Sequence, residues 1–421
     1  MKVGVVGLGY VGLPLLVEIA KSGFEGVGID VDQAKIDAIN AGKNYIEDVK
    51  DEELADLVKA GKVSATTDWS VVRDLGAISI CVPTPLRKTK DPDISYIVSA
   101  VEKISPHLQK GQIIILESTT YPGTTDELLK PEFEKNGMVA GRDFYLAFSP
   151  ERVDPGNPKF KTKNTPKIVG GTTADCSQKA AEFYGKIFDT VVPVSSTMCA
   201  EMVKLLENTF RSVNIGLVNE VALMCDKLQL NVWEVIEAAA TKPFGFMPFY
   251  PGPGLGGHCI PIDPHYLAWK LKSLNYTARF IELASEVNGH MPEFVVDKIV
   301  KALNEDKKAV NGSKIFIVGV AYKPNVTDIR ESPAIDVIGL LQSMGGTVTY
   351  HDPHIPSFEE HGLAMKSVGL DASTLKGCDC VVIVTNHAGL DYDGILANAK
   401  LVVDTRNALK GKSGKARVIK L

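Results

Sequence analysis

The opening segment, residues 2–30, is the part of the sequence that most restricts how this chain folds. Residues 3–6 are apolar, residues 14–23 place apolar side chains at helical spacing, and residues 26–29 are apolar again. This order predicts strand, helix and strand. Further apolar stretches continue the rhythm at residues 77–85, 112–119 and 144–152. The rhythm predicts an α/β fold, with a parallel sheet covered by helices on both faces.

The turn between the first predicted strand and helix carries Gly7, Gly9 and Gly12 in the spacing G-x-G-x-x-G. The first glycine permits a tight turn, the second lets the backbone approach a pyrophosphate, and the third lets helix and strand pack closely. Asp30 ends the next strand, where a carboxylate can hold ribose hydroxyls and would repel a 2′-phosphate. A glycine-rich turn that binds some other ligand is the alternative. Because strand, turn, helix, strand and acid stand in register, we expect NAD rather than NADP.

The rest of the chain divides into a helical middle and a second α/β segment. Residues 197–228 contain no proline and have helical periodicity, which predicts a long helix typical of an interdomain spine or a dimer surface. Residues 314–407 repeat the strand and helix order without a second G-x-G-x-x-G, which argues against a second dinucleotide site. We therefore expect two Rossmann-like doubly wound α/β domains, joined by a long central helix and a helical middle domain. The predicted boundaries are residues 1–196, 197–305 and 306–421.

Composition and charge narrow the class of protein further. The 421 residues are 45% hydrophobic and 23% charged, as in globular proteins of two or three domains. The net charge of -5 offers no basic surface for nucleic acid, and no apolar run approaches the ~20 residues that span a bilayer. The seven cysteines are scattered without a CxxC pair, which favours reduced thiols. We expect a soluble cytoplasmic protein that binds neither nucleic acid nor membranes.

The loop at residues 250–264 surrounds one thiol, Cys259, with prolines and glycines. Neither a helix nor a central strand tolerates so many of these residues, and the glycines would let a ligand approach the backbone. A rigid, accessible mount of this kind suits a nucleophile, whereas a buried cysteine is usually an inert apolar side chain. His258 is either the cation that favours the thiolate or a hydrogen-bonding neighbour. No metal is predicted, because His258, Cys259 and His265 match no common zinc spacing.

Three further residues each have two interpretations. Asp263 follows the thiol by four residues; at the start of a helix it either stabilises that helix or takes part in chemistry. Lys204 and Asn208 stand four apart on the predicted long helix, so they share one face. A lysine there reaches either solvent or a polar cavity, and the residues alone favour solvent.

Six segments occur along the chain in a characteristic order. They are GLGYVGLPLL from Gly7, STTYPGTT from Ser118, FSPERVDPGNP from Phe148, EMVKLLENTFRSVNIGLVNE from Glu201, GGHCIPIDP from Gly256 and GVAYKPNVTDIRESPA from Gly319. Together they resemble the UDP-glucose/GDP-mannose dehydrogenase family over essentially the whole chain. The resemblance implies two Rossmann-like domains and a central helix that forms a homodimer. It also implies oxidation of the C6 alcohol of a nucleotide sugar to a carboxylate, with two NAD used in succession.

The resemblance implies roles for individual residues. Cys259 matches the nucleophile that captures an aldehyde as a thiohemiacetal, which a second oxidation converts to a thioester. Lys204 matches the lysine beside the C6 oxygen, Asn208 its polar companion, and Asp263 the carboxylate that orients this group and a water. Glu151 matches the proposed general base for thioester hydrolysis; without the resemblance it would be a surface glutamate that caps a turn.

The remaining implied contacts are to the cofactor and to the substrate. Thr119 matches a threonine near the hydrolytic water. The implied cofactor residues are Gly7, Gly9, Tyr10, Val11, Gly12, Asp30, Lys35, Thr84 and Thr119. The implied UDP-sugar residues are Glu151, Lys204, Asn208, Tyr250, Gly256, Lys323 and Arg406. Lys323 and Arg406 would face the diphosphate and uridine, whereas Arg330 is as well suited to an ion pair that holds the domain together.

Two departures from the family pattern bear on the sugar. Members that act on UDP-glucose usually have an arginine before the cysteine loop, where this chain has Lys242 and Pro243. The loop reads PGPGLGGHC, which resembles the branch that acts on UDP-N-acetylhexosamines. We expect UDP-N-acetylglucosamine first and UDP-N-acetylmannosamine next, followed by UDP-glucose and the galacto epimers.

Two other functions compete with this prediction. A one-step dehydrogenase of the β-hydroxyacid type also has an NAD domain, a long helix and a helical lysine and asparagine, but needs neither a loop cysteine nor a third domain. A sensor that binds NAD and a nucleotide sugar without reacting would tolerate loss of Cys259, Lys204 or Glu151, all of which are present. The number of NADH formed per substrate separates the one-step reaction from the thioester route.

Overall fold

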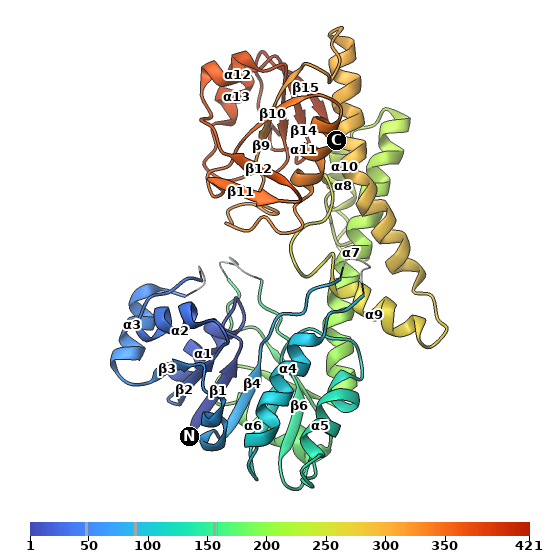
Figure 1. The fold of residues 1–421 in the computed structure, drawn as a ribbon. Helices are drawn as coiled ribbons and strands as arrows, with labels where there is room; N and C mark the ends of the chain where they lie inside the picture. Colours follow the sequence, from blue (N-terminus) through green and yellow to red (C-terminus); the bar gives the residue numbers. More distant parts are fainter. Residues whose placement is uncertain (47–48, 88–90, 155–156, 158) are drawn as a thin grey trace. The chain divides into compact units, whose positions relative to one another are not determined.

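The computed structural model describes residues 1–46, 49–87, 91–154, 157 and 159–421 (Figure 1). The described residues form two compact units. The first unit contains Met1–Glu207 and His265–Thr277, and the second contains Asn208–Pro264 and Ala278–Leu421. The division into three domains at residues 1–196, 197–305 and 306–421 stays a prediction.

A mostly parallel sheet in the order β3-β2-β1-β4-β5-β6-β7-β8 is the centre of the first unit (Figure 1). Its strands are β1 (Lys2–Val6), β2 (Glu25–Ile29), β3 (Val63–Thr66), β4 (Ala77–Ile80), β5 (Ile113–Leu116), β6 (Tyr145–Phe148), β7 (Lys167–Gly171) and β8 (Val191–Val194). The strand order reverses direction between β1 and β4. Ligands of open α/β sheets bind beside the carboxyl ends of the strands at such a switch point.

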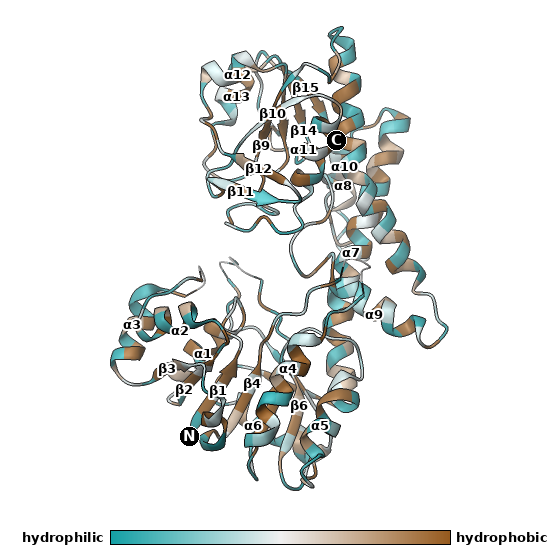
Figure 2. Ribbon diagram, in the orientation of Figure 1, coloured by the Kyte–Doolittle hydropathy of each residue, from teal (hydrophilic) through white to brown (hydrophobic). Residues whose placement is uncertain are grey.

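Helices cover both faces of this sheet, as predicted. Val3 and Val5 pack on one face with apolar residues of α1, α2 and α6, whereas Val6 packs on the other with residues of α4 and α5. The α-helices of this region are α1 (Gly12–Lys21), α2 (Gln33–Asn40), α3 (Asp51–Lys59), α4 (Ser95–Ile104), α5 (Lys130–Glu134) and α6 (Ala174–Tyr184). Short helical segments of other types lie at Trp69–Asp74, Ser105–His107 and Thr125–Leu129. Figure 2 shows that the strands are largely apolar, as burial on both faces requires.

The sheet differs from the prediction at one strand pair. β6 and β7 are antiparallel, with Ala147 opposite Gly171, whereas the rhythm of strands and helices predicts a parallel sheet. The described residues between these strands contain no helix that could serve as a crossover. Parallel neighbours need a long crossover connection, and antiparallel neighbours do not. The predicted parallel sheet is therefore confirmed, with this one antiparallel pair.

The middle of the chain is helical. The predicted long helix is α7 (Thr197–Leu228), which is followed by α8 (Val232–Ala239), α9 (Asp263–Lys272) and α10 (Arg279–Glu305). α7 ends where Gln229 adopts a left-handed backbone conformation, φ 58°, and the side chain of Asn231 then caps α8. Within the described part of the chain, no helix combines the length and the apolar character needed to cross a membrane.

The second unit contains the other predicted α/β sheet, in the order β10-β9-β13-β14-β15, with parallel neighbours throughout. Its strands are β9 (Lys314–Val318), β10 (Thr347–His351), β13 (Cys380–Ile383), β14 (Leu401–Asp404) and β15 (Arg417–Lys420), and a separate hairpin contains β11 (Ser357–Glu360) and β12 (Leu363–Lys366). The helices that follow α10 are α11 (Pro333–Ser343), α12 (Ala372–Gly377) and α13 (Tyr392–Asn398). Ile315 and Ile317 pack with α10 and α11, whereas Phe316 and Val318 pack with α12 and α13. The second doubly wound domain is thus confirmed.

Candidate active site

The glycine turn between β1 and α1 has the geometry that a dinucleotide requires. Gly7 has φ 88°, and a Cβ there would lie 2.6 Å from the carbonyl oxygen of Cys81. A Cβ on Gly12 would lie 1.8 Å from the carbonyl oxygen of Gly7, so only glycine lets α1 start here. A Cβ on Gly9 would have no neighbouring atom within 4 Å, so the backbone there faces open space. The turn therefore fits a pyrophosphate at Gly9, at the N-terminus of α1.

The acid at the end of β2 is tied to this turn. Oδ2 of Asp30 accepts the backbone N–H of Leu8 at 2.8 Å, and Oδ1 accepts that of Asp32 at 3.0 Å. The ammonium of Lys35 lies 3.5 Å from Oδ2. The carboxylate is thereby held at the switch point, where the ribose of NAD would lie.

The other predicted cofactor residues follow strands of the same sheet or belong to the turn. Tyr10 is exposed and Val11 half-buried in the turn itself. Thr84 follows β4, and Thr119 follows β5; both are half-buried. Because β1, β4 and β5 are parallel neighbours, the residues after them lie at one edge of the sheet.

The first unit brings Glu151 and Lys204 together. The ammonium of Lys204, on α7, donates to the backbone carbonyl of Glu151 at 2.6 Å. Lys204 is half-buried, so the solvated orientation that the residues alone favour is not the one found. Oε1 of Glu151 accepts the backbone N–H groups of Arg152 and Val153, each at 2.7 Å. Glu151 thus caps its own turn and also meets a cation.

A buried lysine that the sequence prediction missed also contacts this glutamate. The ammonium of Lys167 lies 3.2 Å from Oε2 of Glu151 and 2.6 Å from Oε2 of Glu117. Burial raises the pKa of Glu151, but Lys167, the N–H of Val153 and Lys204 together bring this pKa below its usual value. Two features of the sequence could have indicated this buried cluster: Glu117 directly follows the apolar β5, and Lys167 begins the apolar β7.

In the second unit, the proline–glycine loop packs closely against its own chain. A Cβ on Gly257, whose φ is 82°, would lie 2.7 Å from the ring of Tyr322, and a Cβ on Gly256 would lie 2.7 Å from the Cβ of the same tyrosine. A Cβ on Gly252 would lie 2.3 Å from the guanidinium of Arg406. The space that side chains here would need is therefore filled by the protein. These glycines are required for the loop to pack, whatever ligand approaches it.

The loop ends in a turn that leads into α9. The carbonyl oxygen of Cys259 accepts the backbone N–H groups of Ile262 and Asp263, at 3.1 and 2.8 Å, and α9 begins at Asp263. Cys259 is half-buried. The partial positive charge at a helix N-terminus favours a thiolate nearby, which is the form a nucleophile needs.

The structure also brings Asn208 and Asp263 together. The amide of Asn208, on α7, donates to Oδ2 of Asp263 at 2.5 Å, and both side chains are buried. A second amide, which sequence reasoning missed, holds the start of the loop: Oδ1 of Asn219 accepts the backbone N–H of Gly252 at 2.9 Å. Asn219 donates in turn to Asn288 of α10 at 2.8 Å. Asp263 lies in the first turn of α9, in line with the helix-stabilising interpretation, and its part in chemistry stays a prediction.

The predicted substrate residues of the second unit lie around the same loop. Arg406 follows β14, donates through Nε to the carbonyl of Val384 at 2.9 Å, and has its pKa lowered to about 10 by burial. Tyr250 stacks on Trp233, with ring centroids 6.1 Å apart. The ammonium of Lys323 lies 5.7 Å from the centroid of the Tyr322 ring.

Two further residues of this unit were predicted with alternatives. Arg330 forms an ion pair with Asp328, two residues before it, at 2.6 Å, and its role stays a prediction. Its Nη2 lies 3.4 Å from Nδ1 of His258, which is thus a hydrogen-bonding neighbour of the loop. Among the described residues, no group of three or more His, Cys, Asp or Glu side chains is placed to hold a metal ion.

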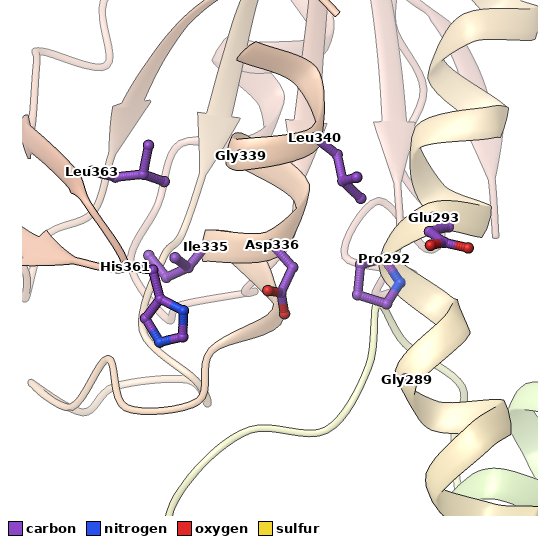
Figure 3. Close-up of a pocket in the computed structure, with 9 residues that line it drawn as sticks. All are labelled: Gly289, Pro292, Glu293, Ile335, Asp336, Gly339, Leu340, His361 and Leu363. Carbon is purple, nitrogen blue, oxygen red and sulfur yellow. The ribbon is translucent and has the colours of Figure 1, made fainter. Parts of the chain in front are cut away.

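The second unit also has a pocket away from these residues (Figure 3). It lies between α10 and α11 and is bordered by the turn that joins β11 to β12. Its lining residues are Gly289, Pro292, Glu293, Ile335, Asp336, Gly339, Leu340, His361 and Leu363. None of these is a predicted catalytic, cofactor or substrate residue.

The glycine turn and the acid after β2, at the switch point of a parallel sheet, define an NAD-binding α/β protein. Comparison with known families narrows this class. Residues 1–188 match the NAD binding domain, residues 198–290 the central domain and residues 316–411 the UDP binding domain of one family. The chain belongs to the UDP-glucose/GDP-mannose dehydrogenase family. It is an NAD-dependent UDP-sugar dehydrogenase.

Individual relatives agree with this assignment. The chain is 36% identical to the UDP-N-acetyl-D-mannosamine dehydrogenase of Methanococcus maripaludis, over 97% of this chain and 93% of that protein. It is 35% identical to the UDP-N-acetyl-D-glucosamine 6-dehydrogenase of Pseudomonas aeruginosa, over 86% of each chain. The solved structure of UDP-D-ManNAc dehydrogenase from Pyrococcus horikoshii has a TM-score of 0.91 at 32% identity, over 100% of this chain and 99% of that one.

Proposed function

We propose that the protein oxidises the C6 hydroxyl of a UDP-N-acetylhexosamine to a carboxylate, in a four-electron reaction. The first substrate we propose is UDP-N-acetylglucosamine, which would give UDP-N-acetylglucosaminuronate. The observation that carries the proposal is Cys259, mounted at the N-terminus of α9 in a loop of the type found in the N-acetylhexosamine branch. A reaction that stopped at the aldehyde would need no such thiol.

The choice of sugar rests on the segment before the thiol. Residues 242–264 resemble the UDP-N-acetylglucosamine subgroup, and Pro243 stands where UDP-glucose enzymes have an arginine. The relatives are named for several N-acetylated sugars, among them an NDP-N-acetyl-D-galactosaminuronic acid dehydrogenase that is 35% identical to this chain. Those named for UDP-N-acetyl-D-mannosamine and for UDP-N-acetyl-D-glucosamine are 36% and 35% identical to this chain, so overall identity does not separate them. UDP-N-acetylmannosamine is the first alternative substrate, and UDP-glucose is the next.

The chain's own residues suggest how the first two steps proceed. Bound NAD supplies the acceptor for each of the two hydrides that leave C6. The ammonium of Lys204 would stabilise negative charge on the C6 oxygen as the first hydride leaves and the hydroxyl proton passes to water. The Cys259 thiolate would then add to the aldehyde carbon, and protonation of the oxygen would give a thiohemiacetal. Loss of a second hydride and of the hydroxyl proton leaves a thioester on the sulfur.

Hydrolysis completes the reaction. Glu151 would take a proton from a water, whose oxygen attacks the thioester carbon, and the Cys259 thiolate would leave. Asp263, held by Asn208 at 2.5 Å, would orient the polar groups around the reacting carbon. Thr119 would help to place the water.

We expect the working form to be a cytoplasmic homodimer. α7 carries exposed apolar side chains at Met198, Met202, Leu206, Phe210, Leu217, Met224 and Leu228. At 100° per residue these positions fall within about a third of the helix circumference. Such a stripe favours a second copy of the chain as its cover. Leu217→Lys should shift the sedimenting mass from dimer towards monomer.

The test of the proposed reaction is a substrate panel. Purified protein with NAD would be given UDP-N-acetylglucosamine, UDP-N-acetylmannosamine and UDP-glucose, and NADH and acid would be counted for each. We expect two NADH per acid, with the largest kcat/KM for UDP-N-acetylglucosamine. Cys259→Ser should lose at least about a thousandfold in acid formation and still bind NAD. Turnover confined to UDP-glucose would show that the sugar is wrong.

A further inference from the structure

A deeply buried charged cluster of the first unit is centred on Lys167, to which the proposed reaction gives no role. The side chain of Lys167 is 4% exposed, that of Glu117 0% and that of Glu151 15%. Lys167 begins β7, Glu117 follows β5, and Glu151 follows β6 by three residues. These strands are neighbours in the sheet order, so the core of the sheet fixes all three side chains.

Lys167 is held in place from several sides. Its ammonium donates to Oε2 of Glu117 at 2.6 Å, while Oε1 of Glu117 accepts the hydroxyl of Tyr184. The oxygen of Tyr184 lies 2.9 Å from the hydroxyl of Ser79 on β4. The Lys167 ammonium also lies 5.2 Å from the centroid of the Phe188 ring. A cation with this many partners has little freedom to move away from Glu151.

The carboxylate of Glu151 is therefore fixed at both oxygens. Oε1 accepts two backbone N–H groups, from Arg152 and Val153, and Oε2 accepts the Lys167 ammonium at 3.2 Å. Its backbone carbonyl accepts Lys204 at 2.6 Å. Two lysines thus hold one glutamate, one through the carboxylate and the other through the main chain.

We propose that Lys167 is a positioning residue for the Glu151 carboxylate, which it holds in one orientation and in the ionised form that accepts a proton from water. Glu117 and Tyr184 anchor Lys167 in turn. The inference rests on the proposed function, in which Glu151 is the general base of thioester hydrolysis. A cluster that only stabilised the fold would not need the charge, because neutral or apolar groups often replace a buried ion pair without loss of stability.

The charges around Glu151 give the direction of the effect. The cations near Glu151 are Lys167 and Lys204, and the nearby anion is Glu117. Burial raises the pKa of the nearby Cys81 thiol well above its usual value. The guanidinium of Arg152 forms an ion pair with the carboxylate of Glu207, at 2.6 Å, rather than with that of Glu151. Without Lys167, burial would dominate and the pKa of Glu151 would rise. Because a base must be ionised to accept a proton, the acid limb of the rate profile should then move to higher pH.

The experiment separates positioning from folding with five variants of the enzyme, among them Lys167→Arg, which keeps the cation. Lys167→Met removes the cation and leaves Glu117 unpaired, so Lys167→Met with Glu117→Gln restores charge balance in the cluster. Glu117→Gln alone keeps the cation beside Glu151. Lys179→Met removes an exposed lysine of α6 whose partner is Glu182, and is the matched control.

Each variant is measured by thermal unfolding, by the pH profile of kcat, and by mass spectrometry of intact protein during turnover. We expect the double variant to unfold near the wild-type temperature and to form NADH in its first turnover. Its steady rate should fall by about tenfold to a thousandfold, with acyl-enzyme accumulating on Cys259 and the acid limb about one pH unit higher. Lys179→Met should keep the wild-type pH limb, and Lys167→Arg should recover most of the rate. Glu117→Gln should not move the limb to higher pH, because the Lys167 cation still faces Glu151 and a nearby anion is gone.

Two results would overturn the role of Lys167, and they are distinguishable. If wild type forms two NADH per acid and the double variant matches its rate and pH profile, Lys167 only supports the fold. If wild type forms one NADH per sugar, or Cys259→Ser still makes acid, the proposed function fails first, and the role of Lys167 fails with it.

Discussion

The two α/β regions of this chain begin with the same turn and use it differently. After β1, the backbone N–H of Gly7 donates to the carbonyl of Ile29 at 2.8 Å. After β9, the N–H of Gly319 donates to the carbonyl of His351, also at 2.8 Å. Both glycines have a left-handed backbone, with φ 88° and 82°. The first strand, the turn and the end of the second strand are therefore joined alike in both regions.

The acid after the second strand is also shared. In the first region the N–H of Leu8 donates to Oδ2 of Asp30 at 2.8 Å, and in the second the N–H of Val320 donates to Oδ2 of Asp352 at 2.7 Å. The difference lies in what else reaches these carboxylates. Oδ2 of Asp352 also accepts the N–H of Ala321 and Nε2 of His387, each at 2.9 Å. The chain itself therefore fills the position at which Asp30 would meet a ribose.

The two turns also differ in their glycines, and this difference too favours a cofactor site in the first region only. Ala321 and Pro324 stand in the second turn where Gly9 and Gly12 stand in the first. Between them, Tyr322 packs against the glycines of the cysteine loop. One scaffold can thus present a cofactor site or support a neighbouring loop, and the choice depends on a few residues after the first strand.

The largest expected effect comes from Gly12. In Gly12→Ala the new Cβ would lie 1.8 Å from the Gly7 carbonyl oxygen, so the turn must move. We expect NAD affinity to fall by at least about a hundredfold, because the pyrophosphate cradle is lost. Gly339→Ala on α11, where a Cβ meets no atom within 4 Å, is the control and should leave NAD binding unchanged. Calorimetric titration with NAD measures both; near-normal affinity in Gly12→Ala would contradict the comparison.

The second expected effect concerns stability in acid. Burial raises the pKa of Asp352, but the His387 bond and the backbone donors outweigh it and lower this pKa from 3.8 to about 2. A lowered pKa stabilises the fold above the unfolded value near pH 4, and the stabilisation is lost as pH falls towards 2. It amounts to about 2 kcal/mol at neutral pH and should fall by about half between pH 5 and pH 3. Denaturant unfolding of Asp352→Asn should show this deficit at pH 6 and a smaller one at pH 3; a deficit that does not change with pH would contradict it.

The third effect separates the two acids by function. Asp30→Asn should weaken NAD binding by about tenfold, because a carboxylate holds ribose hydroxyls better than an amide. Asp352→Asn should change NAD affinity by less than about twofold, since its oxygens are occupied within the protein. Equal losses in the two variants would show that the second turn also binds the cofactor.

The smallest effect is expected at Lys35. Its ammonium lies 3.5 Å from Oδ2 of Asp30, and its side chain is 36% exposed. Exposed pairs contribute little, so Lys35→Met should change NAD affinity by about twofold to threefold. Titration at low and high salt checks this, because a contribution that grows at high salt would not be electrostatic.

Much of this could be predicted from the sequence because the signals are local. The turn at Gly7 needs its glycines for steric reasons, and the loop around Cys259 combines prolines and glycines that exclude regular structure. The direction of β7 could not be predicted, because a strand's own residues do not encode which way its neighbour runs. Lys167 was missed for a similar reason. Its partners come from β5, β6 and α6, and only the folded sheet brings them together.

The most direct test of the account is the number of NAD molecules that each chain binds. The proposed four-electron oxidation of C6 needs two NAD in succession, and both would bind in turn at the glycine turn after β1. Equilibrium dialysis of NAD against the wild-type enzyme should give one site per chain, and none in Gly12→Ala. Two sites per chain, or one that survives Gly12→Ala, would contradict the account.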